Sequence, residues 1–308
     1  RNNRFLANNS IFLIIISSLF HSFWNILTQT SNNSQCFSAL KGIWIIFLAV
    51  VYFSLNGFPL NIGYELFVWA LISGILHGFY ILSLSRAYST EDISYVYPIA
   101  RSAPVFVPFF SWLFLGEKIS LLIVLAVLVI ISAIYILHFD EKLTQGLKKM
   151  YLAIGHNDMR WAFITLFLVV SYSLVDKKAM DKYVFYFPEQ PFTNGVTFFF
   201  LEAVIGFIIC NIYILKKFPF EEIKKNWSLD WRKCFLAAVA TTFSYGLICV
   251  VLQYEKLSAV VSLRQISVLM VVYWGCWKLN EPYGRQRILA GLLVILGVIL
   301  ISIEDNGV

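Results

Sequence analysis

Long apolar stretches separated by short polar connections repeat along the whole chain. A helix that spans a bilayer needs about 20 mostly apolar residues, whereas the strands of a transmembrane barrel alternate over about 10 residues. The pattern therefore predicts membrane-spanning helices rather than strands. The ten predicted spans are 11–29, 38–56, 65–86, 94–115, 119–139, 160–178, 192–215, 233–254, 258–279 and 286–303.

The two halves of the chain share a pattern of polar residues around one span. The first half reads LSRAYSTEDISYVYPIARSAPVFVPFFSWLFLGEKIS, and the second reads LQYEKLSAVVSLRQISVLMVVYWGCWKLNEPYGR. Arg264 follows Arg101 by 163 residues, and Glu281 follows Glu117 by 164, which indicates an internal repeat. Because each repeat has an odd number of spans, the two must lie in opposite orientations, as in many secondary transporters. The predicted organisation is a first repeat over 1–139, a connecting loop over 140–159 and a second repeat over 160–308.

One block of the first half resembles a known family. AYSTEDISYVYPIARSAPVFVPFFSWLFLGEKIS is similar to the first signature of the EamA-type drug/metabolite transporter superfamily, and HSFWNILTQ and YSLVDKKAM resemble companion stretches of one bacterial branch. The resemblance covers nearly the whole chain and is strongest at 73–137. Ser102 stands where that branch often has glycine, and Asn280-Glu281 replaces a Gly-Glu pair.

This resemblance implies a fold and a cellular location. The implied fold is an all-α integral membrane protein, with ten transmembrane helices arranged as two inverted five-helix repeats. The implied location is the bacterial inner membrane, with both termini in the cytoplasm. Because members of the superfamily carry unrelated cargo, the resemblance indicates no particular solute.

Composition agrees with a membrane protein but complicates its orientation. Hydrophobic residues make up 59% of the 308 residues and charged residues 14%, against roughly 45–50% and about 25% in soluble proteins. The mean hydropathy is +0.74. The net charge of +6 lies mostly in short loops, so nucleic acid is not an expected partner. Fifteen Lys and Arg residues follow odd-numbered spans and seven lie on the other side, which favours both termini outside by the positive-inside rule.

Four residues of the fourth span are unusual inside a membrane helix: Pro98, Arg101, Pro104 and Pro108. An arginine at the centre of a span costs about 2.5–3.5 kcal/mol on insertion scales, so Arg101 is expected to line a cavity or to form a structural ion pair. Each proline removes a backbone hydrogen bond and kinks the helix. The three prolines predict a bent helix, either one that reshapes beside a cavity or one fixed for packing.

Other spans carry polar and aromatic residues at helical spacing, which is typical of helices around a cavity. Glu202 is expected either to carry a proton or to pair with an arginine, and the two histidines are expected to be structural or to handle protons. Their spacing fits no metal motif, so neither a metal nor a cofactor is expected. The candidate cavity residues are Arg101, Arg264, His21, Trp24, Asn25, His77, Tyr80, Tyr97, Tyr172, Asp176, Glu202 and Tyr245.

Spans five and ten are nearly free of polar side chains. They are therefore expected at the periphery, where a homodimer contact is one use for their apolar surfaces. Glu117 and Glu281, at span ends, are expected to cap or to form ion pairs rather than to contact cargo.

These features predict a transporter of a small molecule that works in the lipid bilayer by alternating access, driven by proton coupling or by exchange. Arginines in the cavity favour an anionic or zwitterionic solute. No GxSxG, HExxH or P-loop motif is present, so an enzyme or an ATP-driven pump is not expected. The alternatives are a receptor or scaffold without flux and, less favoured, an intramembrane enzyme.

Overall fold

The computed structural model describes residues 9–57, 62–90, 102–138, 160–267 and 285–305, and all regular structure in these ranges is helical. Each predicted span overlaps one of the described helices. The helices are α2 (Ser10–Gln29), α3 (Ser34–Asn56), α4 (Gly63–Thr90), α6 (Ala103–Leu115), α7 (Leu121–His138), α9 (Arg160–Tyr186), α10 (Pro191–Lys217), α11 (Phe220–Val251), α12 (Leu257–Leu263) and α14 (Arg285–Asp305).

Five of the described helices are long and apolar enough to cross a membrane, namely α2, α3, α4, α10 and α11. Two shorter apolar stretches lie in α6 and α7. Helix α9 is long enough to span, but its C-terminal third carries charged residues that find partners. Lys177 lies 2.9 Å from Asp181, and Lys182 lies 2.8 Å from Glu65 on α4.

Two predicted boundaries differ from the structure. Residues 216–232 were expected to be a connection, yet α11 begins at Phe220, with Pro219 before it and Glu221 and Glu222 in its first turn. Acidic residues stabilise the first turn of a helix through its dipole, so this polar segment is helical despite its charge. In the predicted span 258–279, α12 ends at Leu263, and Arg264 occupies a turn rather than the middle of a continuous helix.

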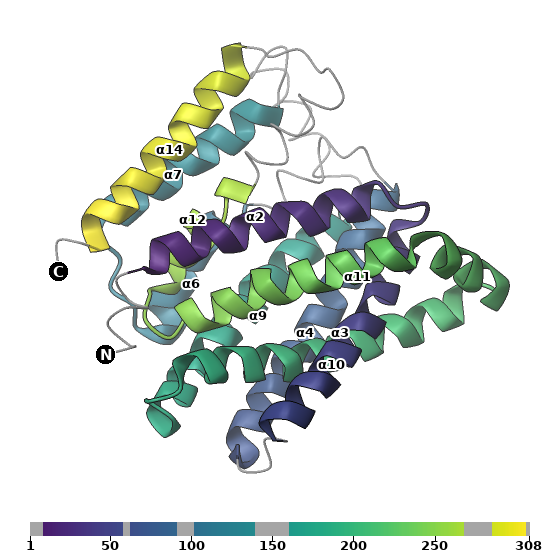
Figure 1. Ribbon diagram of the computed structural model, residues 1–308. Helices are drawn as coiled ribbons and strands as arrows, with labels where there is room; N and C mark the ends of the chain where they lie inside the picture. Colours follow the sequence, from purple (N-terminus) through teal and green to yellow (C-terminus); the bar gives the residue numbers. More distant parts are fainter. Residues whose placement is uncertain (1–8, 58–61, 91–101, 139–159, 268–284, 306–308) are drawn as a thin grey trace.

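The packing partners of the two halves correspond to each other. Helix α4 packs against α9 and α10, and α11 packs in the same way against α2 and α3. Helix α3 packs against α10, and α7 packs against α14. Exchanging each helix for its counterpart in the other half reproduces this set of contacts, as expected for a duplicated unit. Helix α2 begins and α14 ends on the same side of the bundle (Figure 1).

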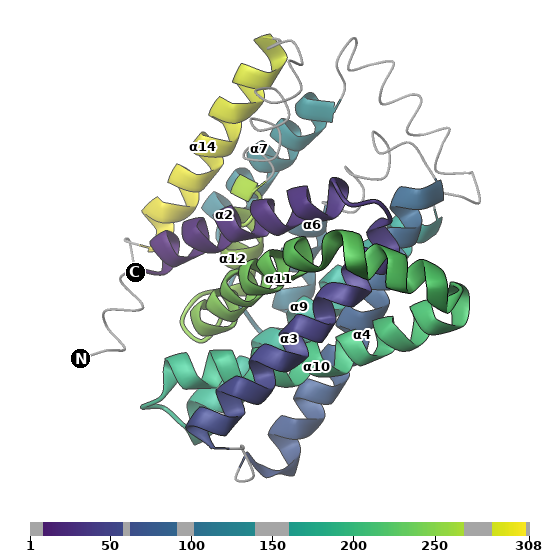
Figure 2. The ribbon, with the colours of Figure 1, turned by 45° about the vertical axis from the view of Figure 1, so that its right-hand side comes forward.

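Helices α7 and α14 form a pair at one side of the other helices, which both ribbon views show (Figures 1 and 2). Their outward side chains are apolar, among them Leu121 and Leu128 on α7 and Leu292 and Ile295 on α14. None of the three central cavities described below takes a described residue from either helix. Their position agrees with the expectation that spans five and ten are peripheral.

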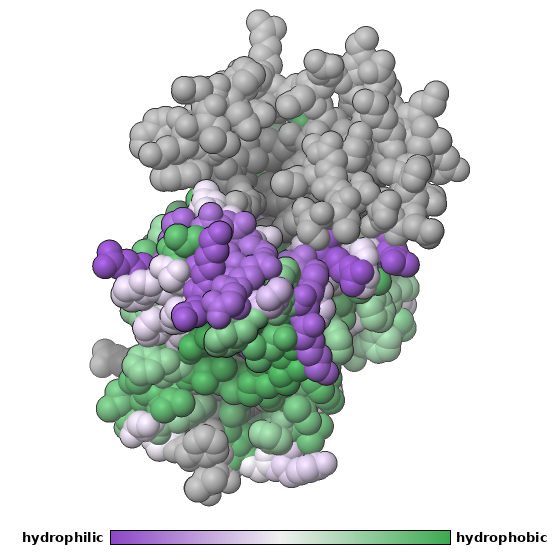
Figure 3. All heavy atoms as spheres, turned by 90° about the vertical axis from the view of Figure 1, so that its right-hand side faces the viewer, coloured by the Kyte–Doolittle hydropathy of each residue, from purple (hydrophilic) through white to green (hydrophobic). Residues whose placement is uncertain are grey.

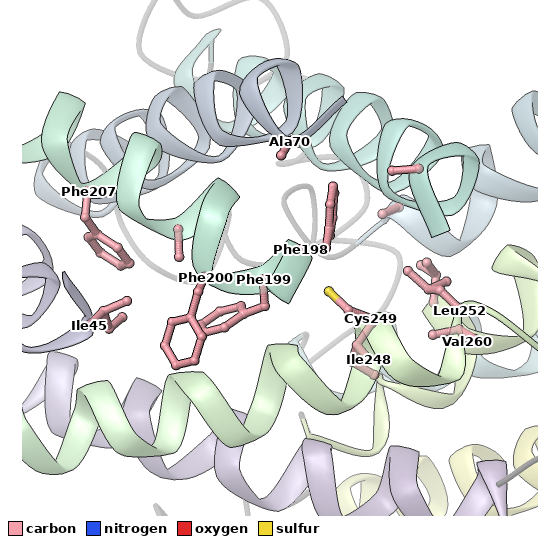
Figure 4. Packing of buried hydrophobic residues seen from close by; sticks show 14 of the residues in the cluster. Ile45, Ala70, Phe198, Phe199, Phe200, Phe207, Ile248, Cys249, Leu252 and Val260 are labelled. Atoms are coloured by element: carbon pink, nitrogen blue, oxygen red, sulfur yellow. The ribbon is translucent and has the colours of Figure 1, made fainter. Parts of the chain in front are cut away.

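The core lies where α10 faces α3 and α11. Phe199 and Phe200 extend from α10 toward α11, and Phe207 points toward Ile45 on α3 (Figure 4). On the surface, polar residues gather near the turn between α10 and α11, where charged side chains such as Lys216 and Lys224 are exposed. The surface next to this turn is apolar (Figure 3). An apolar surface beside charged helix ends is the arrangement that a bilayer and its aqueous boundary require.

A glycine and a glutamate join the ends of α6 and α12. Gly116 has a φ of 69°, a left-handed conformation that glycine adopts at no steric cost, and its N–H donates to the carbonyl of Ser111, so α6 stops there. The next residue, Glu117, accepts a hydrogen bond of 2.8 Å from the backbone N–H of Leu257, at the start of α12. Glu117 therefore caps a helix of the other half, as expected, whereas Glu281 lies outside the described residues.

Removing the N-cap of α3 should lower stability by a measurable amount. The side chain of Asn33 accepts hydrogen bonds of 3.1 Å from the N–H groups of Gln35 and Cys36. We expect Asn33→Ala to reduce the free energy of unfolding in detergent by about 1 kcal/mol, because two helix donors lose their acceptor. Asn33→Ser keeps an acceptor and should retain most of the stability; equal losses in both variants would contradict this account.

Candidate functional site

Three cavities adjoin one another in the centre of the bundle. The inner cavity, of about 70 Å³, is lined from α2, α3, α4, α9, α10 and α11 and by Arg264 after α12. A vestibule of about 370 Å³ adjoins it, and a smaller cavity of about 50 Å³ shares lining residues with both. Trp24, Lys41, Tyr80 and Ile81 line both the inner cavity and the vestibule, so these residues form the neck between the two.

The vestibule reaches the surface where α2 and α3 are joined. Ser31 and Ser34 line it there together with Asn32, which is exposed. Its wall is rich in short polar side chains, including Asn25 and Thr28 on α2. Small polar residues of this kind are suited to a water-filled entrance.

The opposite end of the bundle is closed by one contact between the halves and by others within the second half. The hydroxyl groups of Tyr52 and Thr197 lie 3.2 Å apart, and Asn194 Nδ2 donates to Gln253 Oε1 at 3.2 Å. Lys177 Nζ donates to the carbonyl of Leu252 at 2.8 Å. A further cavity of about 210 Å³ at this end shares no lining residue with the inner cavity. Within the described part of the chain, the bundle is thus open on one side and closed on the other.

Helices α4 and α10 approach each other through glycine residues. A Cβ added at Gly74 would lie 2.6 Å from the carbonyl oxygen of Glu202, and one added at Gly78 would lie 3.0 Å from that of Gly206. Gly74 and Gly78 are four residues apart and share a helix face. Small residues at this spacing allow backbones to approach closely in membranes, and His77 is thereby held against Glu202.

His77 lies between two buried carboxylates. Its Nδ1 is 3.1 Å from Glu202 Oε2, and its Nε2 is 3.9 Å from Asp176 Oδ2. Asp176, on α9, is fully buried and does not line the inner cavity itself. Ser73 donates to its Oδ1 at 2.5 Å, and the hydroxyl group of Tyr245 donates to its Oδ2. Both oxygens of Asp176 are therefore supplied with donors, whereas Glu202 Oε2 accepts no hydrogen bond from the described residues.

Aromatic rings surround this acid–histidine cluster, which comprises His77, Asp176 and Glu202. The ring of Tyr172 stacks on His77 with centroids 3.9 Å apart, and Tyr245 meets the same imidazole edge-on at 5.0 Å. Tyr80 completes the wall, at 5.3 Å from Tyr172. The contacts with Tyr172 and Tyr245 fix the orientation of the imidazole, so that it faces both carboxylates.

Two cations line the inner cavity. Lys41 on α3 is only 2% exposed, and its Nζ lies 3.7 Å from the centroid of the Trp24 ring. The guanidinium of Arg264 lies 5.2 Å from the centroid of Tyr245. Neither cation forms an ion pair with a carboxylate of the described residues. The cavity thus holds both signs of charge on separate helices.

The structure brings most of the predicted site residues together. The inner cavity is lined by eight of them: His21, Trp24, His77, Tyr80, Tyr172, Glu202, Tyr245 and Arg264. Asn25 lines the vestibule, and Asp176 lies outside the inner cavity, where it accepts a hydrogen bond from the Tyr245 hydroxyl group. Among the described residues, Glu202 lies beside His77 and forms no ion pair with Arg264. Pro104 lies in the first turn of α6, where it removes no helical hydrogen bond, and Pro108 lies inside that helix. Tyr97, Pro98 and Arg101 lie outside the described residues.

Sequence reasoning missed Lys41. The predicted span began at residue 38, so Lys41 was counted with the loop charges near the membrane surface. Helix α3 instead begins at Ser34, and Lys41 is buried two turns into it. The available signal was a single lysine followed by a long apolar run, which resembles the lysines at many span ends.

Comparisons with known proteins identify both a family and a fold. A model of the EamA-like transporter family matches residues 8–139 and 159–303. No curated protein matches the chain. A solved structure described as "Crystal structure of protein" superposes with a TM-score of 0.72 at 10% sequence identity, covering 97% of this chain and 99% of that chain. At this identity the likeness shows a shared fold.

A methyl group at Gly74 should separate α4 from α10. We expect Gly74→Ala to lower the free energy of unfolding by about 1–3 kcal/mol, because its Cβ would meet the carbonyl oxygen of Glu202 at 2.6 Å and the Cβ of Ile205 at 2.7 Å, neither of which can move without a shift of the backbone. Gly246→Ala is a matched control on α11, since a Cβ there meets nothing within 4 Å. Thermal unfolding in detergent distinguishes the two, and equal stability of both variants would show that the close approach is not required.

Proposed function

This chain belongs to the EamA-like transporter family, and we propose that it carries a small solute across the membrane by alternating access through the central cavity. The observation that carries this proposal is the asymmetry of the cavity. The vestibule opens beside Asn32, whereas contacts such as Tyr52–Thr197 close the other end. A carrier that exposes one binding site to two sides in turn requires such an open and a closed end.

Transport by rocking of two inverted repeats accounts for the arrangement of the helices. The inner cavity is lined by residues of both halves, including His77 from the first and Glu202 from the second. One contact at the closed end, between the hydroxyl groups of Tyr52 and Thr197, also joins the two halves. Relative movement of the halves would break this contact and form an equivalent one at the vestibule, as in other transporters built from inverted repeats.

A proton shared by Glu202 and His77 is the coupling that we propose. Two carboxylates flank His77 in a fully buried position, and keeping several charges out of water is costly unless they are compensated. Asp176 already accepts hydrogen bonds from two hydroxyl groups, which stabilise its ionised form. Glu202 faces the inner cavity and lacks such donors, which makes it the site where a proton can be gained and lost.

The cations of the cavity support an anionic or zwitterionic solute. Arg264 lines both the inner cavity and the smaller cavity beside it, which agrees with its expected role. Its position in a turn after α12 also fits a transporter, because backbone that leaves the helix at membrane depth is tolerated where it lines a cavity.

An enzymatic role has less support, although Ser73, His77 and Asp176 are the residue types of a hydrolase triad and Ser73 Oγ lies 3.2 Å from His77 Nδ1. The Ser73 side chain is fully buried, and its hydroxyl donates to Asp176 at 2.5 Å. A serine nucleophile would instead face its substrate and donate its proton to the histidine. These residues are therefore better suited to hold Asp176 and His77 in place.

The chain is a multi-pass membrane protein of a transporter family. Its resemblance to a bacterial branch supports a location in the bacterial inner membrane. The apolar outer faces of α7 and α14 would lie against lipid or, in a homodimer, against the same faces of a second copy.

Neutralising Glu202 should separate proton coupling from solute movement. In proteoliposomes, we expect the wild type to accumulate at least one member of a metabolite library when a pH gradient is applied. Glu202→Gln should lose this accumulation by tenfold or more yet still exchange internal for external solute, because the amide cannot carry the proton. Glu65→Gln is the matched control, since Glu65 pairs with Lys182 at the protein surface.

Two results would contradict the proposal. Gradient-driven accumulation by Glu202→Gln at the wild-type level would exclude Glu202 as the proton carrier. Absence of flux by the wild type for every solute in the library would favour the receptor alternative instead.

A further inference from the structure

Lys41 stands at the neck between the vestibule and the inner cavity. It lines both cavities, together with Trp24 and Tyr80, and is 2% exposed. A solute that moves from the vestibule to the acid–histidine cluster must therefore pass its ammonium group. The contacts of the Lys41 ammonium group therefore indicate which chemical groups of a solute could bind there.

The described surroundings of Lys41 hold no counter-ion for it. Its Nζ donates to Thr241 Oγ1 at 3.5 Å, and the hydroxyl of Thr241 itself donates to the carbonyl of Ala237. The ring of Trp24 lies below the ammonium at 3.7 Å and that of Phe207 at 5.7 Å. No carboxylate of the described residues lies within ion-pair distance of Lys41, although five ion pairs of a Lys or His side chain occur elsewhere in α4 and α9–α11.

These contacts compensate only part of the cost of burying the charge. Removing an ammonium from water costs several kcal/mol in real proteins, whereas a cation–π contact returns about 0.5–2 kcal/mol. An anion placed against Lys41 would offset more of this cost through charge–charge attraction. A membrane protein that keeps an ionisable residue in this situation generally uses it for function.

The carboxylates of the cavity are not available for this purpose. Asp176 is bound by Ser73 and Tyr245, and Glu202 faces His77. The titratable groups that surround Lys41 are otherwise His21 on α2, Cys210 on α10 and Cys234 on α11, with Arg264 across the inner cavity. The unpaired charge at the neck is therefore positive.

We propose that Lys41 is the subsite for an acidic group of the cargo, a carboxylate or a phosphorus oxyanion. The rings of Trp24, Tyr80 and Phe207 surround this subsite and receive the apolar or aromatic body of the same molecule. This inference rests on the proposed transport function and specifies its substrate class. It assigns to Lys41 the first contact with the acidic group, before the solute reaches the acid–histidine cluster.

Binding of defined probes tests this subsite without a flux measurement. Phenylphosphonate and phenylacetate carry the two acidic groups on an aromatic body, and phenylacetamide is a neutral analogue of the second. We expect both acids to raise the Tm of the purified full-length chain in detergent by about 2–4 °C, because a ligand that binds only the folded state stabilises it. Phenylacetamide should give no shift.

Variants of Lys41 then assign the effect to this residue. Lys41→Gln should bind the acids at least tenfold more weakly, while Lys41→Arg keeps a positive charge and should retain binding. Lys217→Gln is the matched control, because Lys217 also lies near aromatic rings and donates to Gln35 but lines none of the central cavities. It should bind like the wild type.

The stability of the empty protein separates a binding role from a structural one. Without probes, Lys41→Gln should have a Tm equal to or above that of the wild type, because it removes a buried charge that lacks a counter-ion. The proposal would be overturned if Lys41→Gln had a lower Tm than the wild type and if both variants still bound the acids as the wild type does. Lys41 would then be a packing residue.

A lipid headgroup is the other source of a phosphorus oxyanion. In nanodiscs of phosphatidylcholine alone, the acids should bind as in detergent, and addition of phosphatidylglycerol should not weaken them. Competition by phosphatidylglycerol, or failure of both acids to bind the wild type, would overturn the assignment of Lys41 to cargo. Either result would leave the flux measurement with Glu202→Gln as an independent test of transport.

Discussion

The close approach of α4 to α10 is the contact on which the rest of the site depends. Lipid tails are as apolar as the helix surfaces, so helices in a membrane gain little from hiding apolar side chains and associate through tight packing and polar contacts. Gly74, Gly78 and Gly206 supply the tight packing, because none of them places a side chain between the two backbones. The same approach sets His77 of the first half opposite Glu202 of the second.

The other helices complete the site around this contact. Helix α9 brings Asp176 against α4, and α11 brings Tyr245 over the same carboxylate. Because each of these helices belongs to the half opposite to α4, the acid–histidine cluster exists only when the halves are assembled. A movement of one half against the other must therefore alter the surroundings of His77, which links the shape of the cavity to the protonation of the cluster in the proposed mechanism.

The two carboxylates of the acid–histidine cluster and the ammonium group of Lys41 lie on different helices and in different parts of the cavity. The two carboxylates lie with His77 among α4, α9 and α10, whereas Lys41 lies on α3 at the neck of the vestibule. An acidic group that enters from the vestibule meets the cation first and the protonatable cluster afterwards. In the proposed mechanism, the solute and the proton thus have separate sites within one cavity.

The sequence by itself determined the helical class, the duplicated arrangement and most of the cavity residues. Apolar runs of spanning length leave the backbone no alternative to helices in lipid, and polar residues within such runs, such as His77 and Glu202, are costly unless they face the bundle interior. Only the tertiary structure decided which of them meet. Glu202 lies beside His77 rather than Arg264, and the helix breaks at Arg264. Lys41 is buried against the ring of Trp24, although its position near a span end resembles that of a surface lysine. These outcomes depend on how closely α4, α10 and α3 pack, and the periodicity of one helix carries no information about its distance from another.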